Sequence, residues 1–333
     1  MHMADALVSP SVGANMFVLT GVTAAYSINK LKKDEDFKKK IPTMGVMGAF
    51  VFATQMVNFT IPGTGSSGHL CGGLLLSSIL GPYAGFLSMI GVLLIQCLFF
   101  ADGGLLALGA NCWNMAFYCC FIGSLLWKFI MKNGMSKKKI VFSSILGSVL
   151  TLEFGAFSVV IETLISGITE LPFGIFALAM GPIHLAIGLV EGLITSAVLC
   201  FIYVVRPEML YLANENTERL SYRKILAILA VLFVIIGGEI SLLASSNPDG
   251  LEWSLEKVTG SSKLETDGTT AYSIAERVQE ATSILPDYAF KNSETAIGTI
   301  FSGILGGILV IAILSLLGFI VKFERKKVKT VNE

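Results

Sequence analysis

The chain has 333 residues and a mass of 35.7 kDa, and 53% of its residues are hydrophobic while only 14% are charged. Soluble domains carry about 25% charged residues, because their surfaces need groups that water solvates. The composition therefore predicts an all-α membrane protein with several crossings, and it excludes a water-soluble enzyme. The net charge is zero and the basic residues are confined to short blocks, which excludes nucleic acid as a partner.

Long apolar stretches predict the helices. In chain order these stretches are 13–29, 44–60, 70–100, 104–131, 140–166, 174–205, 224–244 and 297–322. A helix needs about 20 apolar residues to cross a bilayer. The segment 70–127 contains no lysine or arginine and is much longer than one crossing, so we expect three helices there, with irregular points at Gly81-Pro82 and Asp102-Gly104.

The basic residues set the predicted orientation. Four blocks, at 30–40, 128–139, 206–224 and 322–329, hold 20 of the 24 lysines and arginines. Cytoplasmic loops carry the Lys/Arg excess, so these blocks are expected in the cytoplasm. The N-terminus is then external, the C-terminus is cytoplasmic, and the chain lies in the inner, cytoplasmic membrane of the cell.

The predicted alternation of cytoplasmic and external segments divides the chain into two parts. Residues 1–210 are expected to form a seven-helix core, and residues 211–223 a cytoplasmic linker. Residues 224–333 are expected to form a two-helix hairpin that encloses an external polar loop, 245–297. That loop is either flexible or docked on the core as a small domain. We find no internal repeat of the kind that secondary transporters show.

The N-terminus offers a metal chelate. The first residues lack the basic region of a signal peptide, and a bulky second residue blocks methionine removal, so we expect the chain to begin at Met1. The amine of Met1, the backbone nitrogen of His2 and one imidazole nitrogen of His2 close adjacent rings on one metal ion. Planar nitrogen ligation favours Ni²⁺ or Cu²⁺ and also suits Co²⁺. The alternative is a disordered start without a function.

His69 is expected on the same side of the membrane and would supply the fourth nitrogen. It lies in IPGTGSSGHLCGG at 61–73, which has five glycines and a proline. Irregular backbone at membrane depth occurs where protein buries it or where it lines a cavity. The loop is therefore either a plain external turn or a re-entrant segment that holds His69 inward.

Further polar residues fall within apolar stretches, where ionisable groups are costly. His184 and Glu191 lie seven residues apart, on one helix face; they form either a buried hydrogen-bonded pair or part of an ion path. Asn111 and Asn114 either bridge helices or support a metal ligand. Asp5 and Ser67, close to the two predicted ligands, are further candidates for supporting roles. The six cysteines show no C-x-x-C pair and are expected to be buried and structural.

Small residues at Gly21 and Ala25 give the first helix a face that permits close approach. Packing within the chain is the default expectation for this face, and contact with a partner membrane subunit is the alternative.

Four segments together resemble a known family. MHMADALVSP, GTGSSGHLCGG, FFADGGLLALGANCWNM and MGPIHLAIGLVEGLIT are similar to the CbiM/NikM proteins, the substrate-binding membrane components of cobalt and nickel energy-coupling-factor transporters. NPDGLEWSLEKV at 247–258 resembles the CbiN/NikN small subunit. The resemblance implies a nitrogen-only site of Met1, His2 and His69, Ni²⁺ or Co²⁺ as the transported substrate, and a role of the small-subunit part in metal loading.

The resemblance also implies partners, a transmembrane coupling subunit and two cytoplasmic ATPases. No phosphate-binding loop occurs in this chain, which agrees with a separate motor. We therefore expect a metal-capture component of an ATP-driven importer, with no catalytic residues and no cofactor. The alternative is a self-sufficient channel or permease that uses the intramembrane acids. A membrane enzyme based on His184 and Glu191 lacks a nucleophile.

Overall fold

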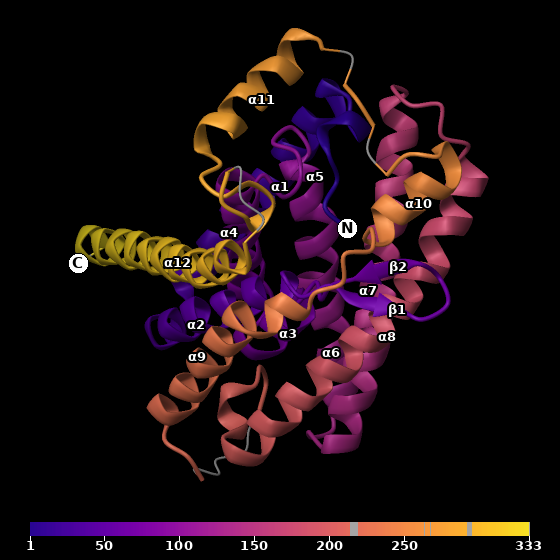
Figure 1. Ribbon diagram of the computed structural model, residues 1–333. Coiled ribbons are helices and arrows are strands. Elements are labelled where there is room, and N and C mark those ends of the chain that lie inside the picture. Colours follow the sequence, from indigo (N-terminus) through magenta and orange to yellow (C-terminus); the bar gives the residue numbers. More distant parts are fainter. Residues whose placement is uncertain (214–218, 263, 267, 292–294, 333) are drawn as a thin grey trace.

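The computed structural model describes residues 1–213, 219–262, 264–266, 268–291 and 295–332, and it is almost entirely helical (Figure 1). The first part of the chain forms α1 (Pro10–Lys33), α2 (Phe37–Gln55), α3 (Gly73–Leu80), α4 (Pro82–Phe100), α5 (Leu108–Cys112), the π-helix η2 (Trp113–Ile122), α6 (Gly123–Met131), α7 (Lys137–Ser166) and α8 (Phe173–Val205). The rest forms α9 (Tyr222–Gly238), α10 (Gly250–Thr259), α11 (Thr270–Thr282) and α12 (Ala296–Asn332). Short 3₁₀ turns lie at Asp5–Leu7, Pro207–Met209, Ile240–Leu243 and Pro286–Tyr288, and two strands at Phe59–Ile61 and Ser66–Gly68.

Six of the described helical segments are long and apolar enough to cross a membrane. They are Pro10–Lys33, Pro82–Phe100, Leu108–Met131, Lys137–Ser166, Phe173–Val205 and Ala296–Phe323. Large apolar side chains such as Phe129 and Leu178 are exposed on these helices, as expected where lipid replaces water. The prediction of an all-α polytopic membrane protein is confirmed.

The segment 70–127 differs from the three equal crossings expected there. It holds three helical segments, but α3 has eight residues and rises only about 12 Å at 1.5 Å per residue. Gly81, with φ of +82°, ends α3 in a conformation that favours glycine, and Pro82 begins α4. The third segment runs without a break from α5 through η2 into α6. Hydropathy measures the length of an apolar stretch and does not reveal that the chain reverses inside it.

A short hairpin precedes α3. Strands β1 (Phe59–Ile61) and β2 (Ser66–Gly68) pair antiparallel, and residues 69–72 lead from β2 directly into α3. The residues from Ser66 to Leu80 are all buried. This irregular backbone is therefore enclosed by protein, as the re-entrant alternative requires, and it carries His69 inward.

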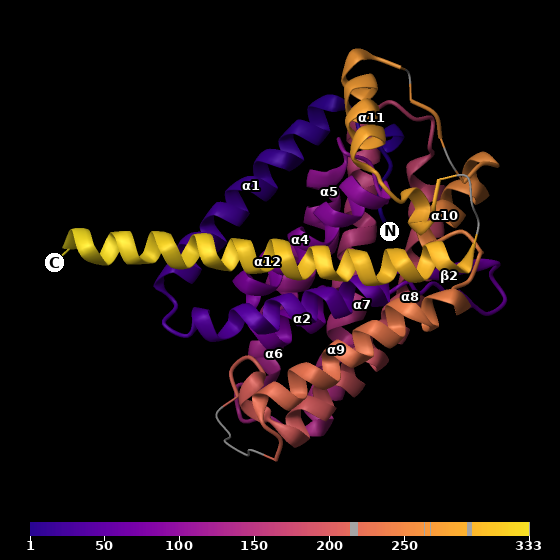
Figure 2. The same ribbon diagram turned by 60° about the vertical axis from the view of Figure 1, so that its left-hand side comes forward.

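Helices α9 and α12 cross at glycines. A Cβ atom on Gly303 would lie 2.0 Å from the carbonyl oxygen of Gly237, so the backbones touch without intervening side chains. Figure 2 shows α12 running across the molecule beside α2 and α9. Its glycine side also accommodates Phe52 of α2 at Gly306. The C-terminal hairpin is therefore packed on the core.

The polar loop between α9 and α12 is docked on the core in its described residues. Trp253 of α10 donates its indole N–H to the carbonyl of Thr64 at 3.0 Å. Tyr272 of α11 donates its hydroxyl to the carbonyl of Val8 at 2.9 Å. Gln279 of α11 donates to the carbonyl of Gly103 at 2.7 Å. Of the two expectations for this loop, the docked one describes these helices.

The small-residue face of α1 packs against nothing in the described chain. A Cβ atom on Gly21 would have no neighbour within 4 Å, and Ala25 is exposed. The default expectation of packing within the chain was therefore wrong for this face, because α1 turns it outward. Val18 and Val22 beside it are also exposed.

We predict that Gly303→Ala destabilises the fold. In an open helix, alanine in place of glycine is stabilising by about 0.5–1 kcal/mol. Here the added methyl meets the Gly237 carbonyl, and overpacking of this kind costs about 1–3 kcal/mol. Thermal unfolding in detergent should show a lower midpoint for Gly303→Ala. Gly238→Ala is the control, since a Cβ there meets nothing within 4 Å; an equal or higher midpoint for Gly303→Ala would contradict the crossing.

Candidate metal centre

The amino terminus is buried at the centre of the molecule (Figure 1). The Met1 side chain is 5% exposed. Its terminal nitrogen lies 3.1 Å from Nε2 of His69 and 2.6 Å from Oδ2 of Asp249. A disordered start is therefore not what the chain has, and the first predicted ligand lies beside the third.

His69 presents an unprotonated nitrogen to the amine. Its Nδ1 donates to the carbonyl of Leu70 at 3.0 Å, which leaves Nε2 as the atom with the lone pair. Burial, followed by the charge of the terminal ammonium, lowers the pKa of His69 to about 3. The ring is therefore neutral at physiological pH, and its free lone pair is the state that binds a metal ion.

His2 stacks on His69, with ring centroids 5.2 Å apart and planes inclined by 24°. Both of its nitrogens have partners. Nδ1 lies 3.2 Å from Oδ1 of Asp102, and Nε2 lies 3.2 Å from Oε1 of Gln96. Burial is the main cause that lowers the pKa of His2. All three predicted ligand residues therefore meet in one place.

The segment that follows the ligands is fixed by Asn111 at the end of α5. The Met3 N–H donates to Oδ1 of Asn111 at 2.7 Å, and the Asn111 amide donates to the Met3 carbonyl at 3.1 Å. Asp5 accepts the N–H of Ala107 at 3.0 Å. Burial raises the pKa of Asp5 despite this hydrogen bond. Asn111 therefore holds Met3 in place, and Asp5 joins the N-terminal segment to Ala107.

Asp249 is the site residue that sequence reasoning missed. It caps α10, where its Oδ1 accepts the N–H groups of Leu251 and Glu252, and Oδ2 accepts from the terminal amine. Burial favours a higher pKa for Asp249, but the ammonium and the hydrogen bonds outweigh it and the pKa is lowered. The Asp-Gly-Leu-Glu capping pattern was visible in the sequence, yet nothing in it indicated contact with residue 1.

Ser67 holds the segment that carries Asp249. Its backbone N–H donates to the Pro248 carbonyl at 2.8 Å, and its hydroxyl donates to the Asn247 carbonyl at 2.8 Å. Ser67 therefore joins β2 to the C-terminal part of the chain and does not face the amine as a ligand.

The remaining candidates contact other elements: Asn114 bridges helices, as one of its two expectations had it, whereas His184 and Glu191 are not paired. Asn114 donates to Oε2 of Glu162 at 2.7 Å, which bridges η2 to α7. Glu191 accepts the N–H groups of Cys71 and Gly72, at 2.7 and 3.0 Å, and so holds the segment that leads into α3. His184 donates from Nδ1 to the Met180 carbonyl. Of the two alternatives for His184 and Glu191, the hydrogen-bonded pair does not form, since both side chains bind backbone groups instead.

Two cavities lie at this centre. A wide cavity of about 770 Å³ lies between the core and the C-terminal loop and reaches His2 and His69. The described residues that line it include the carboxylates of Asp5, Asp102, Asp249 and Glu252 and no lysine or arginine. A second cavity of about 10 Å³ lies beside Met1, His69 and His184. An acidic approach to a nitrogen-rich centre favours cations.

A metal ion at this centre would need the Met1 amine as one of its ligands. Among the described residues, no three His, Cys, Asp or Glu side chains form a cluster that could hold a metal ion. Counting the Met1 amine and the His2 backbone nitrogen brings the nitrogen donors at this centre to four. Nitrogen donors without thiolates suit Ni²⁺, Cu²⁺ and Co²⁺.

Both parts of the chain match known protein families. The family model described as cobalt uptake substrate-specific transmembrane region (CbiM) matches residues 2–209, and the PDGLE domain matches residues 223–323. A fused nickel transport protein of Archaeoglobus fulgidus, NikMN, is 33% identical over 94% of this chain and 96% of its own.

Two further matches extend this agreement. LarMN of Lactiplantibacillus plantarum, also named a fused nickel transport protein, is 30% identical over 91% of this chain and 93% of its own. The crystal structure of a truncated transition metal transporter is 31% identical, with a TM-score of 0.54, over 61% of this chain and 99% of that chain.

We predict that Asp249→Asn releases the N-terminus. Without the carboxylate the terminal ammonium is buried with no counter-ion, and losing a charged hydrogen bond costs about 2 kcal/mol. A change of 1.4 kcal/mol is tenfold in an equilibrium, so an amine-reactive reagent should label Met1 at least about tenfold faster, read by mass spectrometry. Glu256→Gln, an exposed acid on the same helix, should leave labelling unchanged. Equal labelling of both variants would contradict the ion pair.

Proposed function

The chain belongs to the CbiM family of cobalt-uptake transmembrane regions and carries a fused PDGLE domain, and we propose that it captures Ni²⁺ or Co²⁺ for an ATP-driven importer. Its relatives are named nickel and cobalt transport proteins, which supports a transport component rather than an enzyme. The finer proposal is that the ion binds to the Met1 amine, to the backbone and imidazole nitrogens of His2, and to Nε2 of His69.

One observation carries this proposal. The Met1 nitrogen and Nε2 of His69 are 3.1 Å apart. Two nitrogens in neighbouring positions of a square-planar ion, each about 2.0 Å from the metal, are about 2.8 Å from each other. The two ligands are therefore nearly at the spacing that an ion between them requires, although they come from positions 1 and 69.

Charge supports the same site. The protonated amine presents one positive charge to Asp249. A divalent ion bound to the neutral amine and to the deprotonated His2 amide also presents one net positive charge. Asp249 therefore keeps a counter-charge of the same size when the ion replaces the two protons, and metal binding releases those protons.

The His2 ring must turn for the ion. The six-membered chelate ring uses Nδ1, which faces Asp102 at 3.2 Å. Rotation about the Cβ–Cγ bond exchanges the sides of the imidazole, after which Nε2 is the nitrogen able to reach Asp102. Asp102 and Gln96 thus hold the ring in the metal-free chain and remain available to orient it when an ion is bound.

The C-terminal part of the chain serves loading in this proposal. Asp249 touches the amine, and the hydroxyl of Tyr288 donates to Asp102 at 2.5 Å. Both ligand residues at the N-terminus are therefore contacted, directly or through one residue, by the PDGLE part. We keep the division into a core at 1–210, a linker at 211–223 and a hairpin at 224–333 as part of the proposal; residues 214–218 of the linker lie outside the described residues.

The proposed importer contains partner subunits. From the four basic blocks we infer that the N-terminus and the wide cavity face the outside. In this proposal, two cytoplasmic ATPases linked by a transmembrane coupling subunit hydrolyse ATP. The open face of α1 at Gly21 and Ala25 is the surface we assign to that coupling subunit, since small residues allow helices to approach closely.

We predict that extending the N-terminus by Gly-Ser before Met1 abolishes tight binding. Two residues are needed, because a single one would place His2 third in the chain, where the amine, two amides and the imidazole chelate Ni²⁺ without His69. Chains purified from medium with equal Ni²⁺ and Co²⁺ should hold one ion with the native N-terminus and none with the extension. Metal content by mass spectrometry is the readout.

The matched control carries Gly-Ser at the C-terminus and should keep its ion. His69→Ala should lose it, because the fourth nitrogen is then absent. Retention of one ion per chain by both the N-terminally extended protein and His69→Ala would overturn the chelate.

We also predict that uptake needs the ATPases. Vesicles that contain the chain with the coupling subunit and both ATPases should accumulate ⁶³Ni²⁺ when ATP is supplied, and vesicles with the chain alone should not. A catalytically inactive ATPase pair is the control for assembly without hydrolysis. Accumulation by the chain alone at the same rate would instead support the self-sufficient permease.

A further inference from the structure

His184 has a buried nitrogen with no partner. The residue lies in α8 and its side chain is 0% exposed. Nδ1 donates to the Met180 carbonyl at 2.8 Å, so Nε2 carries the lone pair. No hydrogen-bond partner for Nε2 is present among the described residues. A buried imidazole nitrogen without a partner is costly, so this atom calls for a ligand.

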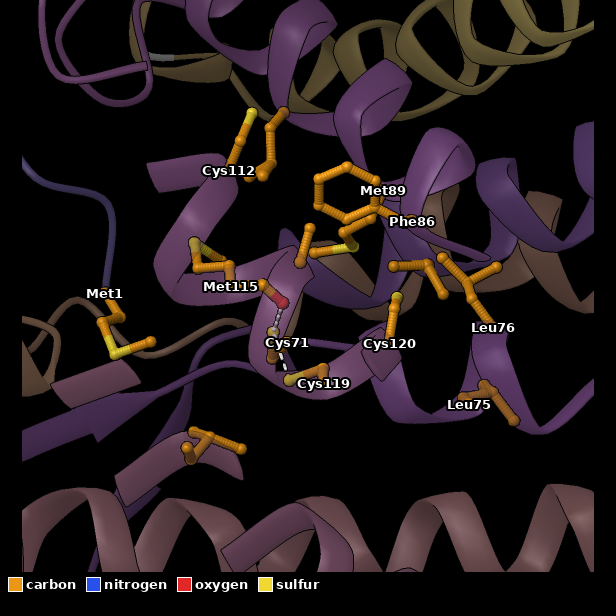
Figure 3. Packing of buried hydrophobic residues seen from close by; sticks show 14 of the residues in the cluster. Met1, Cys71, Leu75, Leu76, Phe86, Met89, Cys112, Met115, Cys119 and Cys120 are labelled. Atoms are coloured by element: carbon orange, nitrogen blue, oxygen red, sulfur yellow. Dashed lines mark hydrogen bonds between the residues drawn. The ribbon is translucent and has the colours of Figure 1, made fainter. Parts of the chain in front are cut away.

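His184 lines the small cavity that Met1 also lines. The residues that line the cavity include Met1, His69, Cys71, Met115 and His184. Its volume of about 10 Å³ is close to the least that holds one water-sized particle. Figure 3 shows Met1, Met115 and Cys71 around this region of the sulfur-rich core. Met1 and His69, two of the proposed ligands, and His184 therefore line the same small cavity.

We propose that His184 forms a second, inner position for the transported ion, which takes the ion from the Met1–His69 pair. The proposal rests on the proposed function, because it needs an ion at the outer chelate. The imidazole supplies one nitrogen, and the thioethers of Met1 and Met115 are the neighbouring soft donors. Imidazole and thioether ligands suit late transition ions and exclude Mg²⁺ and Ca²⁺, which take oxygen ligands.

The inner position differs from the outer one in a way that favours onward movement. The outer site binds through a deprotonated amide and fused chelate rings, which hold an ion tightly. The inner set is neutral and its donors belong to separate elements: Met1 to the N-terminus, Met115 to η2 and His184 to α8. Relative movement of these elements spreads the donors apart, so the ion is held weakly enough to leave.

The test separates capture from transfer. His184→Gln removes the imidazole and keeps a polar side chain. The complete transporter should keep one ion per chain and its half-saturating metal concentration, because the outer chelate sets both, while the maximal uptake rate falls by about 10–100-fold, the usual effect of losing a metal-supporting group. His184→Cys, which supplies another soft donor, should restore part of the rate.

Thr195→Val is the matched control. Thr195 lies on the same helix, is also 0% exposed and has a hydroxyl without a partner, but it does not line the cavity. It should change neither binding nor uptake.

Two outcomes would overturn the inner position. Uptake by His184→Gln at the wild-type maximal rate would mean that the cavity holds only a trapped water. Loss of metal content together with uptake would mean that His184 acts only by packing against the outer site. Failure of the outer chelate itself is read separately, on the N-terminally extended chain, which keeps His184.

Discussion

A buried ion pair between the first residue and Asp249 is the contact on which the site depends. An ammonium group in a protein interior is stable only when a counter-charge and hydrogen bonds replace its water. Asp249 supplies the charge at 2.6 Å, and His69 accepts at 3.1 Å. Because Asp249 belongs to the PDGLE part, the buried amine has its counter-charge only when the C-terminal part is docked. The fusion of both parts in one chain keeps that carboxylate near the amine.

The re-entrant segment gives the centre its second half. A short α3 begins inside the molecule, and Glu191 of α8 accepts the N–H groups of Cys71 and Gly72, the two residues that precede it. The hairpin before it pairs its edge with Pro248 through Ser67. His69 lies between these two anchors. Its imidazole is therefore fixed by backbone on both sides, which is the precision that a metal ligand needs.

Sequence reasoning brought Met1, His2 and His69 together because histidine is rare in this chain and the basic blocks predict the same side for all three, and the structure places these residues side by side. It also identified the all-helical membrane class from the low charge, the high hydrophobic content and the long apolar stretches. The short length of α3 could not be predicted from the sequence, since an apolar stretch looks the same whether the chain crosses once or reverses at Gly81. The outward orientation of Gly21 could not be predicted either, because a small-residue pattern indicates a contact face but not what contacts it.

Asp249 shows a different limit. Its capping pattern predicts the start of α10, but the contact with Met1 spans 248 positions and arises from how two parts of the chain dock. Likewise, His184 and Glu191 share a helix face, yet the carbonyl of Met180 and the end of α3 bind them separately. Spacing along one helix predicts which residues face the same way. It does not predict which neighbouring element reaches them first.

The nitrogen-only ligand set at the N-terminus is tested most directly by X-ray absorption spectroscopy of the full-length chain loaded with one Ni²⁺ ion. We expect a square-planar spectrum with four nitrogen neighbours at about 2 Å and no sulfur in the first shell. A six-coordinate shell of oxygen and nitrogen, or a shell containing sulfur, would contradict capture by the Met1 amine, His2 and His69.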